Sequence, residues 1–467
     1  MELLAITNFN IILSVLGGWI TFSGLFSSLL KEKYYLSEAV TSLLAGAILS
    51  NVVHVLDPLD YAGGSPERLG AATLALSRLV LGVQLVIAGV QLPRRYLRAQ
   101  WRPLSLLLGP GMLAAWACSS AAIWAAVPGR LPVLHALAIG ACVAPTDPIL
   151  AGAVVKGRFA DENVPAALRD LIVAESGAND GLGYPFLFFA LYLIKYTGGV
   201  GEAAVGLSGS STEGGAGTAL GLFLWHTCGY VVLLSVGYGW VVGSAARRIL
   251  RWAERRRHVD RESLLVFAVP LALFIVGTCG MAGSDDVLAC FVAGNAFTWD
   301  DWFRLKTADD PIQPTVDMLL NVAVFMWLGA ACPWASFWSG EVVGPGRLAA
   351  LGVLVLLFRR LPAILGLYRR IPQIEDGRQA LFVGHFGPIG VSAIFYLYVG
   401  LEFLQTVTVG DAQRPDAKQL GEVMTVVIWF LVICSVVVHG LSIPAAKLGS
   451  CVWATAVPRP GAIALPP

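Results

Sequence analysis

The chain has 467 residues, of which 56% are hydrophobic and 13% are charged, and its formal net charge is +1. A soluble protein carries roughly a quarter charged residues, and nucleic-acid binding needs a strongly basic surface. The composition therefore excludes a soluble domain and predicts no nucleic-acid partner. Since a spanning helix takes about 20 apolar residues, we expect an all-α polytopic membrane protein embedded in the lipid bilayer.

Apolar runs bounded by glycine, proline and charged residues predict about 13 transmembrane helices. In chain order the runs cover residues 8–30, 36–56, 70–92, 103–126, 131–155, 168–194, 219–245, 262–282, 284–298, 315–339, 346–368, 378–403 and 420–446. The first run is too long for the core of a cleavable signal and has no basic residue before it, so it is expected to span the membrane. The ninth run is short for a span.

Basic residues concentrate in alternate loops, beginning with the loop at Lys31 and including the cluster Arg247–Arg261. The positive-inside rule then places the N-terminus outside and the C-terminus in the cytoplasm. We expect a transmembrane domain over residues 1–447 and a short cytoplasmic tail over 448–467. The Gly/Ser-rich stretch 196–217 is predicted to be a flexible external linker.

No motif indicates a cofactor or an enzyme. The eight cysteines never occur as Cys-x-x-Cys, so we interpret them as small packing residues and not as a disulfide framework or a metal site. Neither Gly-x-Ser-x-Gly nor His-Glu-x-x-His occurs in the sequence, which argues against the hydrolases that use these motifs.

The sixth predicted span contains Glu175-Ser176-Gly-Ala-Asn179-Asp180. On a helix these four polar side chains share adjoining rows of one face. An ionisable group inside a membrane usually marks an ion or proton pathway. Asp180 can hold a cation through its carboxylate, beside the Ser176 hydroxyl, or it can hold a proton. The alternative is a polar contact between helices.

The fifth predicted span is interrupted by Pro145-Thr146-Asp147-Pro148. The two prolines remove amide donors, which leaves the carbonyls of Ala141 and Ala144 without helical partners. Non-helical backbone at membrane depth is tolerated only where it lines a cavity or is buried in protein. We therefore expect a binding site here, with a simple packing kink as the alternative.

A second interruption, Gly384–Gly390, lies in the twelfth predicted span and contains His385. Two broken helices in corresponding halves of a transporter indicate inverted repeats with a binding site between them. His385 can titrate near neutral pH and serve in pH sensing, or it can be a hydrogen-bonded structural group.

Arg359 and Arg360 lie inside the eleventh predicted span. A buried guanidinium needs a carboxylate partner, and Glu175 is the candidate.

Asp285 and Asp286 open the ninth predicted span. They can belong to the ion path, or they can lie at the interface, solvated or capping the helix. Arg78, in the third span, is a candidate for function or for a contact between helices.

These motifs together resemble those of the fungal Na⁺/H⁺ antiporters, in the Asn-Asp branch of the monovalent cation:proton antiporter superfamily. The resemblance rests on Pro145-Thr146-Asp147-Pro148, Glu175-Ser176-Gly-Ala-Asn179-Asp180, Phe-Arg-Arg360-Leu-Pro and Gly384-His-Phe-Gly-Pro-Ile-Gly, and it covers essentially the whole membrane domain. The animal exchangers carry Gly-Leu-Arg-Gly where this chain has Gly-His385-Phe-Gly, so the role of that arginine cannot be transferred.

The resemblance implies a sodium/proton antiporter-like fold in which two broken helices cross, and a homodimer with a moving core. It implies that Asp180 is the shared cation and proton site. Na⁺ would bind at Asp180, Asp147, Thr146 and Ser176, and Asn179 would mark a branch that is usually electroneutral. Glu175 would pair with Arg360 in preference to Arg359.

The leading hypothesis is a secondary active transporter that exchanges Na⁺ or Li⁺, or K⁺, for H⁺ by alternating access. It would export cytosolic cation across the plasma membrane for pH and salt homeostasis. A sodium-coupled organic-solute symporter on a similar fold is the main alternative. A channel is less favoured, because its filter normally repeats identical segments around a pore, and this chain has none.

Overall fold

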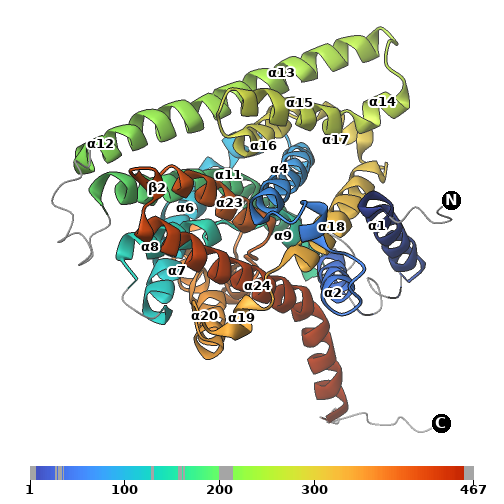
Figure 1. The fold of residues 1–467 in the computed structure, drawn as a ribbon. Helices are drawn as coiled ribbons and strands as arrows, with labels where there is room; N and C mark the ends of the chain where they lie inside the picture. The colour runs from blue at the N-terminus through green and yellow to red at the C-terminus, as the bar shows by residue number, and fades with distance from the viewer. Residues whose placement is uncertain are drawn as a thin grey trace, which may run out of the picture.

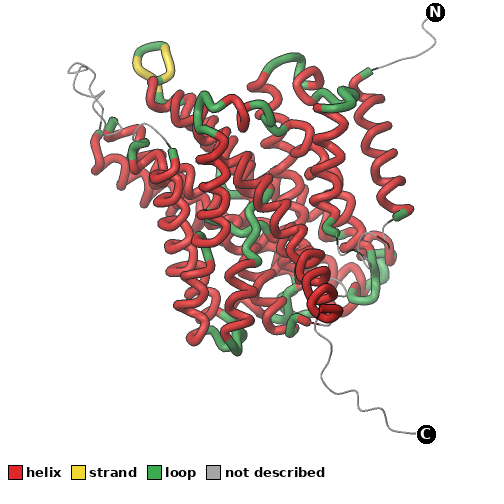
Figure 2. The backbone as a smooth tube through the Cα atoms, turned by 90° about the horizontal axis from the view of Figure 1, so that it is seen from below, coloured by secondary structure: helices red, strands yellow, loops and turns green. Residues whose placement is uncertain are grey.

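The computed structural model describes residues 7–26, 29, 34, 36–127, 131–155, 160, 163–198 and 214–456. Lys31, most of the predicted linker 196–217 and the last part of the predicted tail lie outside these residues. The described chain folds as a bundle of helices with one antiparallel hairpin, in which β1 (Thr408–Val409) pairs with β2 (Ala412–Gln413) (Figure 2).

The longer helices match the predicted spans one by one, although the number that cross a membrane stays a prediction. Their bounds are α1 Asn8–Leu25, α2 Glu38–Asn51, α4 Pro66–Gln91, α6 Trp101–Leu106 with α7 Met112–Ala126, α8 Val133–Val143 with α9 Pro148–Val155, α11 Ala166–Thr197, α12 Gly215–Leu222 with α13 Leu234–Arg255, α14 Arg261–Val266 with α15 Ala268–Met281, α16 Asp286–Phe297, α18 Ile312–Ala331, α20 Pro345–Phe358 with α21 Leu361–Leu367, α22 Gly377–His385 with α23 Val391–Gln405, and α24 Pro415–Ala456.

Short elements complete the described chain. They are α3 Pro58–Tyr61, α5 Tyr96–Ala99, α17 Trp302–Thr307, α19 Ser336–Ser339, the 3₁₀ turn Tyr368–Arg370, and two π-helical segments, Leu107–Gly111 and Phe223–Leu233. Both π-helical segments lie inside continuous apolar helices. Among the described residues, seven helices are long and apolar enough to cross a membrane by length and composition.

Two helices are broken where the sequence predicts. The chain leaves the helical conformation between α8 and α9 and again between α22 and α23. The two breaks meet, because the amide of Asp147 donates to the carbonyl of Pro388 at 2.9 Å. Figure 2 shows loop segments in the interior of the helix bundle as well as at its ends. The bundle therefore brings its irregular backbone together where it is enclosed by helices.

Helix ends that the charge pattern assigns to one side of the membrane gather together. Arg251, near the end of α13, pairs with Asp300 at 2.5 Å, and Arg261 pairs with Asp310 at 3.5 Å. Helix α13 continues to Arg255, beyond the predicted limit at residue 245, and lies along one side of the bundle beside α15 and α16 (Figure 1). Helix α24 also runs past the predicted domain boundary at residue 447.

Helices α2 and α18 pack with their backbones in contact. A Cβ atom on Gly46 would lie 2.0 Å from the carbonyl oxygen of Met326, and a Cβ on Gly329 would lie 2.0 Å from that of Leu43. Small residues permit this close approach between helices in lipid. The pair is therefore held by backbone contact that any side chain at either glycine would prevent.

Replacing Gly329 by valine should force α2 and α18 apart and lower the free energy of unfolding by roughly 1–3 kcal/mol, the usual cost of overpacking. The matched control is Gly277→Val in α15, where an added Cβ meets no atom within 4 Å. Thermal unfolding of the purified proteins in detergent compares the two. Equal melting temperatures would mean that the close approach of α2 and α18 does not limit stability.

Candidate functional site

The polar motif of the sixth predicted span lies in the first half of α11. Glu175, Ser176, Asn179 and Asp180 are all buried, with exposed fractions of 2%, 2%, 3% and 0%. They occupy two successive turns of one helix, so their side chains point toward the same neighbours. The structure thus brings together the residues that the sequence places on one face.

Two residues of this motif, Ser176 and Asn179, are hydrogen bonded to Thr146 in the first broken helix. The Asn179 side-chain amide donates to Thr146 Oγ1 at 2.8 Å, and the Thr146 backbone amide donates to Asn179 Oδ1 at 3.1 Å. The Thr146 and Ser176 hydroxyls are 3.1 Å apart. Asn179 therefore fixes the unwound turn against α11, and the two hydroxyls form one connected polar group.

Asp147 lies at the start of two helices that follow the breaks. Its carboxylate accepts a hydrogen bond from the amide of Leu150 in α9 at 3.1 Å and another from the amide of Val391 in α23. The first amides of a helix lack partners within it and favour a negative charge. A Cβ on Gly390 would lie 2.3 Å from Asp147 Oδ2. Only glycine at position 390 lets the carboxylate reach both helices.

Asp180 is different from the other acids of the site. Both of its carboxylate oxygens are buried, and neither accepts a hydrogen bond from any residue that the structure describes. The Ser392 hydroxyl neighbours the carboxyl group but is outside hydrogen-bond geometry. The Tyr396 hydroxyl donates to the backbone carbonyl of Asp180 and not to its side chain. A buried carboxylate in this condition is costly unless it binds a proton or a cation.

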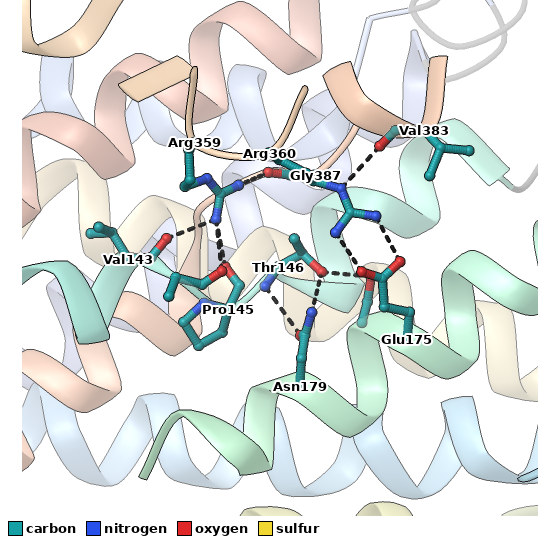
Figure 3. A network of polar contacts seen from close by, with 11 residues as sticks. Val143, Pro145, Thr146, Glu175, Asn179, Arg359, Arg360, Val383 and Gly387 are labelled. Carbon is teal, nitrogen blue, oxygen red and sulfur yellow. Dashed lines mark hydrogen bonds and ion pairs between the residues drawn. The ribbon is translucent and has the colours of Figure 1, made fainter. Parts of the chain in front are cut away.

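Glu175 forms an ion pair with Arg360. Arg360 donates to the two carboxylate oxygens of Glu175 at 2.5 and 2.6 Å, and its Nε donates to the carbonyl of Val383 at 3.0 Å (Figure 3). The bidentate geometry engages both oxygens. Arg360, which the resemblance favours over Arg359, is the partner of Glu175, and the pair links α11 to the end of α22.

The acids that open the ninth predicted span are buried, so they are not solvated, and one of them caps the helix as one alternative expected. Asp285 and Asp286 are 5% and 4% exposed. Helix α16 is about 18 Å long at 1.5 Å per residue, much shorter than a bilayer core of about 30 Å, so one of its ends must lie below the surface. Asp285 caps α16 by accepting from the amide of Leu288 at 2.9 Å, and Asp286 pairs with Arg78 at 2.5 Å.

His385 is a hydrogen-bonded group, whose Nε2 lies 3.1 Å from the Ser442 hydroxyl. Sequence reasoning missed two further residues of α24. The amide of Ile389 donates to the Ser435 hydroxyl at 2.7 Å, and His439 Nε2 lies 2.9 Å from the carbonyl of His385. These contacts hold both sides of the second break. In the sequence, the signal for these contacts is that two polar residues, Ser435 and His439, lie one helical turn apart in an apolar span.

Removing one partner of the Glu175–Arg360 pair should be much more harmful than removing both charges. A buried charge left alone costs about 3–5 kcal/mol, so Glu175→Gln and Arg360→Gln should each lower the melting temperature strongly. The double variant should recover part of the loss. Arg347→Gln, at an exposed position, is the control. Additive losses in the double variant would show that the two side chains do not stabilise each other.

Comparisons with known proteins find a matching family and several relatives of this chain. The family model for the sodium/hydrogen exchanger transmembrane region matches residues 18–447. A probable Na⁺/H⁺ antiporter of Schizosaccharomyces pombe is 37% identical over 93% of this chain and 56% of its own length. Na⁺/H⁺ antiporter 2 of Zygosaccharomyces rouxii is 35% identical over 96% of this chain and 54% of its own length. The chain thus spans about half the length of these relatives.

A second S. pombe protein, a Na⁺/H⁺ antiporter, is 30% identical and is covered over 90% of its own length. Among solved structures, the sodium proton antiporter MjNhaP1 of Methanocaldococcus jannaschii superposes with a TM-score of 0.64 over 93% of this chain, at 16% identity. That likeness confirms the predicted fold class. On the family match and the relatives together, this chain belongs to the sodium/hydrogen exchanger family.

Proposed function

We propose that the chain exchanges a monovalent cation for a proton, with Asp180 as the shared binding site. The observation that carries this proposal is the buried Asp180 carboxylate, which accepts no hydrogen bond from the described residues. Both oxygens of Glu175 and both oxygens of Asp147 accept hydrogen bonds. Of these three acids, Asp180 is therefore the one that is available to a transported ion.

The exchange follows from the charge of this one group. In a low-dielectric site Asp180 is stable when a proton or a cation neutralises it. A cation that binds the carboxylate displaces the proton, and a proton displaces the cation, so the site carries one or the other across the membrane. Oxygen atoms are the ligands that hard cations prefer. In this proposal, oxygen atoms of Asp147, Thr146 and Ser176 are the further ligands of the cation that Asp180 binds.

Asp285 is a second acid in the electrostatic surroundings of Asp180. One of its oxygens caps α16, and the other is buried with no hydrogen-bond partner among the described residues. We assign it to the path by which the ion or proton reaches Asp180. His385 and Asp286 are hydrogen bonded or paired, and we assign them a structural role beside that path.

The names of the relatives support the choice of transported ion. Three of them are named as Na⁺/H⁺ antiporters, so Na⁺ is the proposed cation, with Li⁺ and K⁺ as further candidates. Cation export at the plasma membrane, a homodimer, an external N-terminus and a membrane domain over residues 1–447 belong to the same proposal. The ion pairs Arg251–Asp300 and Arg261–Asp310, which join two of the predicted cytoplasmic loops, support this orientation.

An organic-solute symporter is less well supported by the site. Its pocket needs several polar groups that are available to the solute. Here Ser176 and Asn179 both bond to Thr146, and Arg360 forms an ion pair with Glu175. The arrangement fits a small ion better than a solute with many hydrogen-bonding atoms.

Asp180→Asn should abolish exchange, because an amide can neither release a proton nor neutralise a cation. Purified protein in sealed liposomes with an acidic lumen would be challenged with external Na⁺, Li⁺, K⁺ or choline. The wild type should alkalinise the lumen in response to at least one metal cation, and the variant should give only the background signal.

Asp309→Asn makes the same chemical change at an exposed position and should keep the wild-type rate. Thermal unfolding would check that Asp180→Asn is folded. Cation-driven alkalinisation at the wild-type rate in Asp180→Asn would place the exchange site elsewhere.

A further inference from the structure

Four arginines meet where the end of α13, the loop after α4 and the loop after α16 come together. Arg247 lies in α13, and Arg95, Arg248 and Arg251 belong to its electrostatic surroundings. Asp300, which follows α16, is the carboxylate among these neighbours, and it is paired with Arg251 at 2.5 Å. We call the four basic residues the arginine cluster.

The arginine cluster carries more positive charge than the acids beside it neutralise. Two further acids of these elements have other partners, because Arg304 donates to both oxygens of Asp301 at 2.6 and 2.7 Å and Lys306 pairs with Glu254. Four arginines and one carboxylate leave three positive charges unbalanced. In the described part of the chain, every arginine of the cluster except Arg251 lacks a carboxylate partner. Because like charges repel, their gathering favours an anion from outside the chain.

The backbone and two tryptophans hold Arg95 in the cluster. Arg95 has a φ of +51°, in the left-handed region that residues other than glycine seldom adopt. Its guanidinium carbon lies 5.6 Å from the centre of the Trp299 ring, which is within the range of a cation–π contact. The Trp299 ring meets that of Trp240 edge to face, with the ring centres 4.6 Å apart. The position of Arg95 is therefore built by the fold and does not depend on an acid.

An exposed apolar face continues from the arginine cluster along α13, which lies along one side of the bundle (Figure 1). Val241 is 64% exposed and Trp252 is 56% exposed. Arg248 follows Val241 by seven residues and precedes Trp252 by four, so the three side chains share one face of the helix. Tryptophan is enriched where a membrane meets water. This face therefore places unbalanced positive charge beside an apolar surface at the level of lipid headgroups.

We propose that the arginine cluster binds the phosphate of an anionic phospholipid, whose acyl chains pack against the exposed apolar face of α13. Guanidinium groups match the oxygens of a phosphate in pairs. A soluble phosphate compound would meet the same arginines but would gain nothing from the apolar face, so the structure favours a lipid. In the predicted orientation the cluster lies at the cytoplasmic leaflet, which carries the anionic lipids. The site is separate from Asp180 and does not rest on the proposed function.

The test measures the melting temperature of the purified chain in a neutral detergent as phosphatidylserine or phosphatidylcholine is added to the micelles. Phosphatidylserine should raise the melting temperature in a saturable manner, because a ligand of the folded state stabilises it. Phosphatidylcholine has no net charge and should give no such rise. The double variant Arg95→Gln/Arg247→Gln should lose most of the rise. Arg370→Gln removes an exposed arginine from another basic loop and should keep all of it.

Glycerophosphoserine, which is the same headgroup without acyl chains, separates a lipid from a soluble phosphate compound. It should leave the melting temperature unchanged, and a rise equal to that with phosphatidylserine would overturn the choice of a lipid. An equal rise with phosphatidylcholine, or an undiminished rise in the double variant, would overturn the site itself. If the double variant does not fold, the exposed Arg248→Gln decides the matter. It should show a smaller rise than the wild type, and a full rise would contradict the proposal.

Discussion

The need to satisfy irregular backbone inside a membrane governs the whole site. Two helices are interrupted at the same place, and each interruption leaves amides at one helix end and carbonyls at the other. Asp147 meets the amides of α9 and α23 with its two oxygens. Arg359 meets the carbonyls that follow α8 and α22. One anion and one cation therefore stabilise both breaks, and Gly390 is required because Asp147 lies against it.

The same pairing leaves Asp180 as the buried carboxylate of α11 that is available for transport. Glu175 is neutralised by Arg360 and Asp286 by Arg78, while Asn179 and Ser176 are used to hold Thr146 in place. Asp180 belongs to the same two turns of α11 but has no such partner among the described residues. In our proposal this network holds the oxygen atoms of Thr146 and Ser176 in place as further ligands, and Asp180 is the group that binds either the cation or the proton.

The sequence predicts the parts of this site that depend on local chemistry. Prolines and glycines mark both breaks, and one face of α11 carries the polar motif. The sequence does not predict contacts between residues that are far apart along the chain. Nothing in Phe-Arg-Arg-Leu-Pro shows that Arg359 turns toward carbonyls more than 200 positions earlier in the chain. The burial of Asp285 depends on how deep the short helix α16 lies, and the contact of Ser435 and His439 with the second break depends on the path of α24.

The central claim is that proton and cation compete for Asp180, and proton release on cation binding tests it most directly. NaCl would be added to purified protein in weakly buffered detergent solution, and the pH change would be recorded against choline chloride. We predict that sodium releases protons from the wild type and that Asp180→Asn releases none. Sodium binding to the wild type without proton release, or equal release from the variant, would contradict the account.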